Sequence, residues 1–379
     1  MRCATKKYYL LIFVLTSLVF SEDLVYEYTI HEGANLISFP LISDNYDIDY
    51  FFTSDNSNLF SNSAIDENLS SIIGEGELAF KLNNEWIGSL DEINTQKGYW
   101  LISDEELSFL IISEGHSENL YYLHPGGNLI SYPFNQEQPF YEAIPFFSDN
   151  ILAILGENEA LLNVNGAFVG SLTTFKPGRG YWFIVEYHAP YQYNEPSVNS
   201  NSGYNNESNS RENQTLDFNQ STLQNAFFIE SIYQSGNENN TPIELEANCN
   251  DIIVGQTLWE EEYSDLIVMG NDGLGLTENY CNTNQEVIIK NNDTILYNLS
   301  GDNTWEPNNF EILILSDSDF GDLNYNQYIN ISDIVILIEH IIGINTFDNN
   351  HQLLLADINL DDSINISDVV SLIDRILNF

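Results

Sequence analysis

Basic side chains are scarce in this sequence of 379 residues, which has 10 Lys and Arg against 57 Asp and Glu and a formal net charge of −47 at pH 7. Because no basic stripe is available to neutralise phosphates, we expect the chain to bind neither nucleic acid nor anionic lipid. Such a surface attracts cations instead. Solubility or adaptation to salty water explains most of this charge, and ion binding explains only the part in the C-terminal loops.

Long apolar runs are also absent, except at the N-terminus. Arg2 and Lys6 precede an apolar run over residues 8–20, and Val19 and Ser21 occupy the −3 and −1 positions of a cleavage site. The run is shorter than a bilayer-spanning helix, which needs about 20 residues. The sequence therefore predicts a signal peptide at 1–21, a secreted or cell-surface location, and no membrane span in the mature chain.

Cysteine is nearly absent, with three residues in the whole chain. Cys3 leaves with the predicted signal peptide, so Cys249 and Cys281 remain. A lone pair in an exported protein favours a disulfide, with two unrelated buried thiols as the alternative. The six histidines are scattered, which argues against a zinc site.

Catalytic motifs are missing as well. The sequence has no Gly-x-Ser-x-Gly elbow, phosphate loop, paired-histidine metal motif or Cys-His arrangement. Acid pairs cannot be singled out among 57 carboxylates. We therefore expect the protein not to be an enzyme.

An internal repeat dominates the first half of the chain. The segment HEGANLISFP at 31–40 returns as HPGGNLISYP at 124–133, and KGYW at 97–100 returns as RGYW at 179–182. Aromatic residues make up 13% of the sequence, which favours strands. We predict duplicated β-rich modules at 24–114 and 117–189. They resemble modules with this Asn-Leu-Ile-Ser and Gly-Tyr-Trp pattern in many secreted bacterial multidomain proteins. Trp86, Trp100 and Trp182 are expected in the core rather than on a sugar-binding surface.

The composition then changes twice. Residues 190–219 are rich in Asn, Ser, Glu and Gly, which predicts a flexible linker. Residues 221–316 contain a buried strand at each end, with Val254-Gly255, Met269-Gly270 and Trp305-Glu306 between them. This order resembles a β-sandwich module recurrent in secreted proteins. A carboxylate beside glycine, such as Asp272, is ordinarily a turn residue rather than an ion ligand.

The strongest signal lies in the last sixty residues. The segment DLNYNQYINISD at 322–333 recurs as DINLDDSINISD at 357–368. Oxygen-bearing side chains at loop positions 1, 3, 5, 9 and 12, with the carbonyl of position 7, match the spacing that wraps a loop around one hard cation. Position 6 is usually Gly because the turn requires a positive φ, but here it is Gln327 and Asp362.

Each loop is followed by a segment with helical apolar spacing. The predicted stripes consist of Ile334, Leu337, Ile338 and Ile341 after the first loop, and Val369, Leu372, Ile373 and Ile376 after the second. Gly343 is placed to end the first helix. Ile329 and Ile364, at position 8, are expected to join the loops through a short β-bridge.

Two loop-plus-exit-helix units, without a strongly marked entering helix, resemble dockerin repeats over residues 317–379. The resemblance implies two Ca²⁺ sites and a protein partner, cohesin-like or another surface protein. The family's ligand positions fall on Asp322, Asn324, Asn326, Tyr328 (carbonyl), Asn330 and Asp333, and on Asp357, Asn359, Asp361, Ser363 (carbonyl), Asn365 and Asp368.

The modules together predict a mainly β protein with a small α-helical C-terminal domain. The leading hypothesis is an exported, calcium-binding, non-enzymatic assembly or adhesion protein. The alternative is a component of polysaccharide degradation, because dockerins are often appended to glycoside hydrolases. A carbohydrate-binding protein that uses exposed aromatics, with a polysaccharide as partner, is a third hypothesis.

Overall fold

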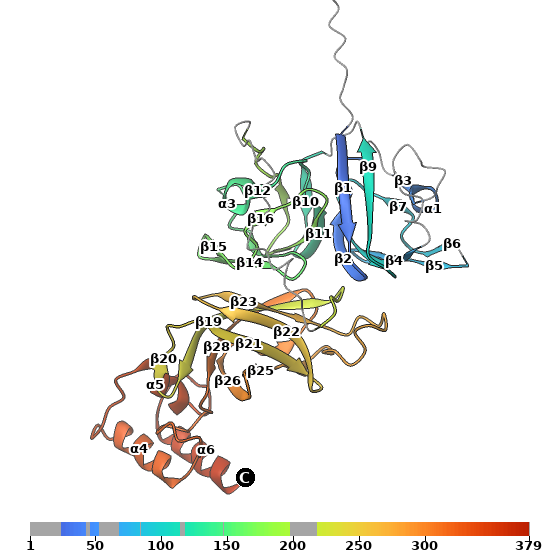
Figure 1. The fold of residues 1–379 in the computed structure, drawn as a ribbon. Helices are drawn as coiled ribbons and strands as arrows, with labels where there is room; N and C mark the ends of the chain where they lie inside the picture. The colour runs from blue at the N-terminus through green and yellow to red at the C-terminus, as the bar shows by residue number, and fades with distance from the viewer. Residues whose placement is uncertain are drawn as a thin grey trace, which may run out of the picture.

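The structure is a computed structural model, and it describes residues 24–42, 46–52, 68–83, 85–113, 118–146, 148–197 and 218–378. The predicted signal peptide lies outside these residues, as do residues 198–217 of the predicted linker. Strands dominate the molecule up to residue 316, and the helices of the C-terminal end lie beyond them (Figure 1). The predicted mainly β fold with a small helical domain is confirmed.

The first module is built on a five-stranded antiparallel sheet in the order β2-β8-β4-β5-β6. The pair β1-β9 and the short pair β3-β7 complete it, with the short helix α1. The bounds are β1 Leu24–Ile30, β2 Gly33–Ser38, β3 Tyr46–Asp47, α1 Ile48–Phe51, β4 Leu69–Gly74, β5 Glu77–Leu82, β6 Glu85–Gly88, β7 Glu92–Ile93, β8 Gly98–Ser103 and β9 Leu107–Ser113.

The second module repeats this topology strand for strand, with the sheet order β11-β17-β13-β14-β15 and the pairs β10-β18 and β12-β16. The duplicated sequence therefore folds as duplicated structure. The bounds are β10 Tyr121–Leu123, β11 Gly126–Ser131, β12 Gln138–Pro139, α3 Phe140–Ala143, β13 Ile151–Leu155, β14 Ala160–Val164, β15 Ala167–Val169, β16 Thr174–Phe175, β17 Gly180–Val185 and β18 Ala189–Tyr191.

The two modules bind each other through reciprocal contacts, as in an isologous dimer. The Ser38 amide donates to the Gly178 carbonyl at 2.8 Å, and the Ser131 amide donates to the Gln96 carbonyl at 3.0 Å. A His–Glu pair flanks each contact, between His31 and Glu157 and between His124 and Glu75. Repeated contacts in both directions make the two modules one structural unit.

Two of the three tryptophans of the repeat lie in the core, as expected. Trp100 and Trp182 are 1% and 8% exposed and pack in the core shared by the modules and the sandwich. Trp86 is half-buried, with the Lys81 ammonium 5.5 Å from its ring centroid. Two of these three rings are therefore closed to a ligand.

The predicted linker is too long at both ends. β18 pairs with β10, and Tyr193 is 1% exposed with its carbonyl accepting a hydrogen bond from Asn119. At the other end, Phe218 is 8% exposed and belongs to the sandwich core. Single buried aromatic residues, Tyr193 and Phe218, hold these ends in place. The composition of the whole segment, which is rich in Asn and Ser, does not reveal them.

Residues 218–316, which we call the sandwich after the sequence resemblance, form one eight-stranded sheet in the order β20-β19-β28-β26-β25-β21-β22, with β23 paired to β19. The longest strand, β19, pairs in parallel with β28 and antiparallel with β23. A disulfide joins Cys249 to Cys281, with the Cα atoms 5.2 Å apart. The bounds are β19 Gln224–Gln234, β20 Asn237–Glu238, β21 Ile243–Cys249, β22 Ile252–Trp259, β23 Ser264–Met269, β24 Gln285–Glu286, β25 Ile288–Asn291, β26 Thr294–Ser300, β27 Thr304–Trp305 and β28 Asn309–Ser316.

The sandwich packs against the second module. The Ser171 amide and hydroxyl donate to the two carboxylate oxygens of Asp265 at 2.8 and 2.7 Å. Gln224 donates to the Gly156 carbonyl at 2.7 Å, and Leu162 lies in the shared core. Polar and apolar contacts together fix the sandwich on this module.

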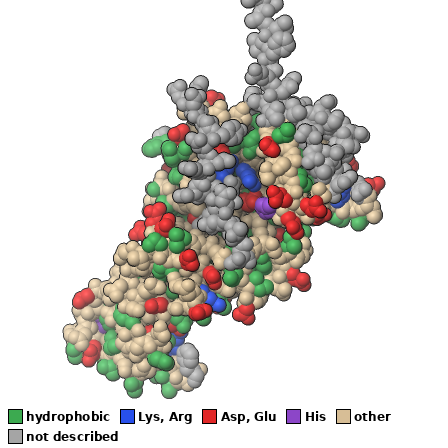
Figure 2. All heavy atoms as spheres, viewed as in Figure 1, with side chains coloured by type: hydrophobic (Ala, Val, Ile, Leu, Met, Phe, Trp, Pro, Cys, Tyr) green, Lys and Arg blue, Asp and Glu red, His purple; other side chains and the backbone are tan. Residues whose placement is uncertain are grey.

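The C-terminal domain contains three helices, α4 Ile331–Ile341, α5 Asn350–Ala356 and α6 Ile366–Leu377. Leu337, Leu355 and Leu372, one from each helix, are fully buried in its small core. Figure 2 shows hydrophobic side chains over this end of the molecule, and acidic side chains far outnumber basic ones on the face in view.

Candidate metal centre

The first and last carboxylates of loop 1 (residues 322–333) hold the loop closed by accepting backbone hydrogen bonds. The amides of Asn326 and Gln327 donate to the two oxygens of Asp322 at 3.0 and 2.8 Å. Asp333 accepts from the amides of Leu323 and Asn330 at 3.0 and 2.9 Å. The chain therefore wraps around two convergent carboxylates.

Loop 2 (residues 357–368) repeats this arrangement. The amides of Asp361 and Asp362 donate to Asp357 at 3.1 and 2.8 Å. Asp368 accepts from the amides of Ile358 and Asn365 at 2.9 and 2.8 Å. The twofold sequence repeat thus produces two loops with the same internal geometry.

Left-handed backbone at two positions lets each loop turn this tightly. Position 6 has φ of +66° at Gln327 and +61° at Asp362, which confirms the positive φ expected there. Position 4 has the same conformation, with φ of +60° at Tyr325 and +56° at Leu360. The two loops therefore adopt the same left-handed backbone at both positions, although neither position carries the usual glycine.

Positions 9 and 12 also start the exit helices. Asn330 is the N-cap of α4, and its side-chain oxygen accepts from the Ser332 amide at 2.9 Å. Asn365 does the same for α6, with the Ser367 amide at 2.8 Å. In both helices the last loop carboxylate completes a capping box. Because the cap occupies this oxygen, position 9 is better suited to reach a cation through a water than directly.

The electrostatics of loop 1 favour a cation. Burial raises the pKa of Asp333, and the nearby charge of Asp322 raises it further, against the lowering effect of the backbone hydrogen bonds. Asp322 is 1% exposed. Arg375, the basic residue in the last turn of α6, pairs with Asp319 outside the loop. Two buried like charges are therefore held together, which is unfavourable without a positive charge between them.

One orphaned atom supports the same conclusion. The side-chain oxygen of Asn324, at position 3, is buried and has no hydrogen-bond partner, while its amide donates to Asp333 at 2.8 Å. A buried acceptor without a donor is costly. Ca²⁺ takes six to eight oxygen ligands of this kind, so the residues fit calcium. Across the described residues, no three His, Cys, Asp or Glu side chains gather closely enough to hold a metal ion by themselves. A cation in either loop would therefore also need asparagine and carbonyl oxygens.

One expectation about the loops is wrong. Within the described residues 218–378, no β-bridge joins Ile329 and Ile364, and both side chains instead pack against the domain core. The second loop has an entering helix, α5, which is only seven residues long and was not strongly marked in the sequence. Its sequence, NHQLLLA, is too short to show a clear helical period.

The helices carry an apolar stripe that sequence analysis missed. Ile338 and Ile373 were expected in the core but are 38% and 40% exposed. They belong to a second stripe, which we call the outer stripe. The outer stripe consists of Ile331, Val335, Ile338 and Ile342, repeated 35 residues later as Ile366, Val370, Ile373 and Leu377, and all eight side chains are exposed. Gly343 has φ of +74° and follows the first helix as expected.

The C-terminal domain has a known relative. Residues 320–377 match the model of the dockerin type I domain. The domain is thus a dockerin domain, as its sequence resemblance implied, and dockerin domains bind calcium, dock onto cohesin-type proteins and occur in extracellular and cell-surface proteins. No curated protein matches the chain.

The solved structures add little. The major pilin protein from Streptococcus pyogenes is 7% identical, with 76% of this chain and 98% of that chain covered and a TM-score of 0.14. A score this low carries no argument about fold or function. Among the described residues, no helix is long and apolar enough to cross a membrane.

Proposed function

We propose that this chain is an exported, non-enzymatic assembly or adhesion protein that docks a cohesin-type partner through its C-terminal dockerin domain. The outer stripe carries this proposal. Ile331 and Ile366, which open the two helices, are 73% and 66% exposed although both are large and apolar. Contiguous exposed apolar surface of this kind marks an interaction site, and helix faces are a common form of it.

The two loops position the outer stripe, because each exit helix begins inside its loop. Asp333 and Asp368 close their loops and also cap the helices that carry the stripe. We propose two Ca²⁺ sites, with the ligands named above. A bound Ca²⁺ would supply the positive charge that the converging carboxylates lack, so docking should require calcium.

A capture experiment with the full chain tests this function. Immobilised protein is exposed to a panel of purified cohesin domains in calcium and in chelator. We expect one or more domains to bind in calcium only, and the double variant Ile331→Asp, Ile366→Asp to lose binding at least tenfold. Tyr122→Asp is the matched control, because Tyr122 is 80% exposed in the second module. Binding that survives the double variant would place the contact elsewhere.

The non-enzymatic part of the proposal needs its own test. It rests on the absence of any catalytic motif and on the burial of Trp100 and Trp182. The purified chain should leave polysaccharides intact. Hydrolysis that one Asp or Glu substitution abolishes would instead assign the chain to polysaccharide degradation.

A further inference from the structure

The sandwich and the dockerin domain meet at a stack of three rings. His351, in α5, lies between Tyr233 of β19 and Tyr325 of loop 1, with ring centroids 4.6 and 5.0 Å away and interplanar angles of 11° and 17°. The imidazole is fully buried. It therefore fills the space between a strand of the sandwich and loop 1 of the dockerin domain.

Other contacts hold the sandwich and the dockerin domain together at the same place. The Ser235 amide donates to the Asp317 carboxylate at 3.0 Å, next to the β19–β20 turn. A Cβ atom on Gly236 would lie 2.5 Å from the Tyr325 ring, so the turn is in close contact with loop 1. The junction is thus closely packed on the side of the ring stack.

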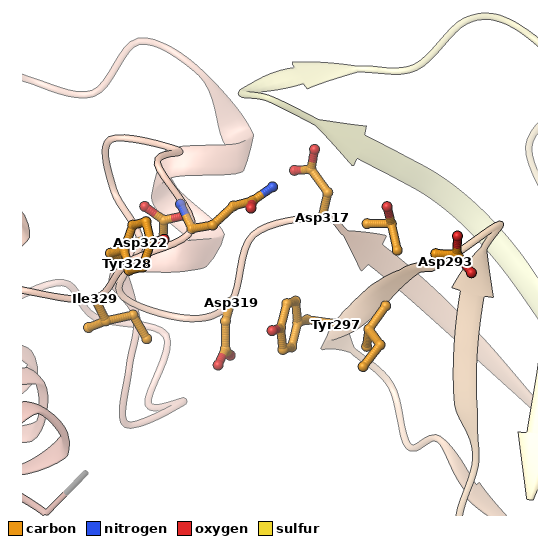
Figure 3. A pocket seen from close by; sticks show the side chains of 10 residues that line it. Asp293, Tyr297, Asp317, Asp319, Asp322, Tyr328 and Ile329 are labelled. Carbon is orange, nitrogen blue, oxygen red and sulfur yellow. The ribbon is translucent and has the colours of Figure 1, made fainter. Parts of the chain in front are cut away.

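The other side of the junction is open. A cleft of about 670 Å³ separates loop 1 from the β25–β26 hairpin. Figure 3 shows Asp322, Tyr328 and Ile329 of loop 1 on one side of it and Asp293 and Tyr297 on the other. The domains are therefore held at one edge and have room to move at the other.

We propose that the Tyr233–His351–Tyr325 stack is a pH-sensitive lock, which holds the dockerin domain on the sandwich at neutral pH and releases it in acid. Among the described residues, the imidazole has one hydrogen-bond partner, the Ser316 hydroxyl, 2.8 Å from Nε2. Nδ1 is buried and has no hydrogen-bond partner in that part of the chain. A second proton on this ring would be a buried charge with no acceptor for the Nδ1 hydrogen.

The groups that face His351 do not offset this cost. β19 contributes Tyr233 and loop 1 contributes Tyr325, two neutral phenols. The segment after β28 contributes Asp317, whose charge favours the protonated ring, and α5 itself has no acidic residue in its first turn. Burial prevails over Asp317 and lowers the pKa of His351 to about 4 from 6.5.

The direction of the effect follows from these values. Between pH 6.5 and about 4 the released ring binds a proton that the locked ring does not. The lock is therefore fully effective above pH 6.5 and weakens as the pH falls toward 4, by up to tenfold in the opening equilibrium for each pH unit. Tyr325 belongs to loop 1, so release also removes a support from that loop.

Hydrogen exchange of the full chain in saturating calcium tests the lock without any docking partner. After correction for the intrinsic effect of pH, protection of the β19–β20 turn and of loop 1 should fall between about pH 7 and about pH 5. His351→Phe keeps a ring in the stack but cannot be protonated, so it should abolish this loss. His340→Phe is the control. His340 stacks on Phe347, with the two ring centroids 4.0 Å apart, and takes no part in the junction stack.

Each outcome decides the proposal. An unchanged junction in the unmodified chain at about pH 5 would overturn it, as would the same acid response in His351→Phe and the unmodified chain. Should His351→Phe fold poorly, small-angle scattering of the unmodified chain supplies a second measure. Its radius of gyration should rise between about pH 7 and about pH 5, above the range in which most carboxylates titrate. Failure here would leave cohesin docking at neutral pH unaffected.

Discussion

The chain contains two duplications, and in each of them the sandwich covers a segment of one copy whose counterpart in the other copy is exposed. In the second β-module, Ala160 and Leu162 are buried under the sandwich, at 0% and 2% exposure. Leu78 and Phe80, at the same places 82 residues earlier, are each 40% exposed. The duplicated hairpin therefore has one apolar face inside a core and one facing solvent.

The calcium loops differ in the same way. Loop 1 is seated against the sandwich by the Tyr325 stack, whereas Leu360, its counterpart in loop 2, is 67% exposed. Asp322 is buried and Asp357 is half-exposed. Equivalent positions of a repeat thus lie in unequal environments, because the sandwich packs on only one of the two. The difference between the copies is tertiary, and matched substitutions can measure it.

The largest expected effect concerns the two hairpins. Leu162→Ala should destabilise the chain by about 3 kcal/mol, because it leaves a cavity in the shared core. Phe80→Ala should cost about 1 kcal/mol or less, although it removes more atoms, because that face is already open to water. Denaturant unfolding followed by tryptophan fluorescence measures both. Equal losses would show that the exposed hairpin face is covered by something in solution.

The calcium loops should differ by about tenfold in affinity, or about 1.4 kcal/mol. Loop 2 offers three carboxylate ligands, Asp357, Asp361 and Asp368, and loop 1 offers two. Ligand charge is a main determinant of affinity in such loops, so loop 2 should bind more tightly and order first. The seating of loop 1 opposes this difference by holding the loop in shape before calcium binds.

Calorimetry on the full chain measures the calcium affinities of the two loops. It thereby shows whether ligand charge in loop 2 or packing of loop 1 on the sandwich has the larger effect. Two unequal sites are expected, with Asp357→Ala removing the tighter one and Asp322→Ala the weaker one. The opposite assignment would mean that the sandwich contributes more to loop 1 than a third carboxylate contributes to loop 2. Chelator should also reduce the helical signal of α4 and α6, since each helix begins in a loop that repels itself without calcium.

A smaller effect is expected from two glycine substitutions, which distinguish a steric clash at the junction from backbone strain alone. Gly236 and Gly343 both have positive φ, +85° and +74°. An alanine at either position should cost about 1–2 kcal/mol in backbone strain. At Gly236 the new methyl group would also meet the Tyr325 ring, while at Gly343 no atom lies within 4 Å. Gly236→Ala should therefore destabilise more in thermal unfolding, and only it should expose the junction to hydrogen exchange.

Sequence patterns identified the features that depend on near neighbours. The ligand spacing, the helix that follows each loop and the repeated strands all follow from residues a few positions apart. Which copy the sandwich covers does not follow from such local patterns. Leu78 and Ala160 occupy the same place in the same alternating pattern, and nothing local distinguishes a strand face that meets water from one that meets another domain.

The helix faces show the same limit. An apolar residue occurs at Ile334 and Leu337 but also at Ile331 and Val335, so the helix has apolar residues on more than one side. The side that becomes the core is decided by α5 and the opposite exit helix, which pack there. Counting i, i+3 and i+4 positions correctly selected Ile334, Leu337 and Ile341 for the core of the domain. It wrongly added Ile338 and overlooked the outer stripe.

The smallest expected effect concerns the helix caps, which are the same in the two loops. Asn330→Ala and Asn365→Ala should each cost about 1 kcal/mol, because each removes the acceptor for a helix amide. Serine at either position keeps a capping oxygen and should restore most of the loss. Since the cap bonds are local, the sandwich should not alter them, and the two alanine variants should agree within a few tenths of a kcal/mol in thermal unfolding. A clearly larger loss at Asn330 would mean that the contact of loop 1 with the sandwich also stabilises the first turn of α4. The influence of the sandwich would then extend beyond the loop into the helix.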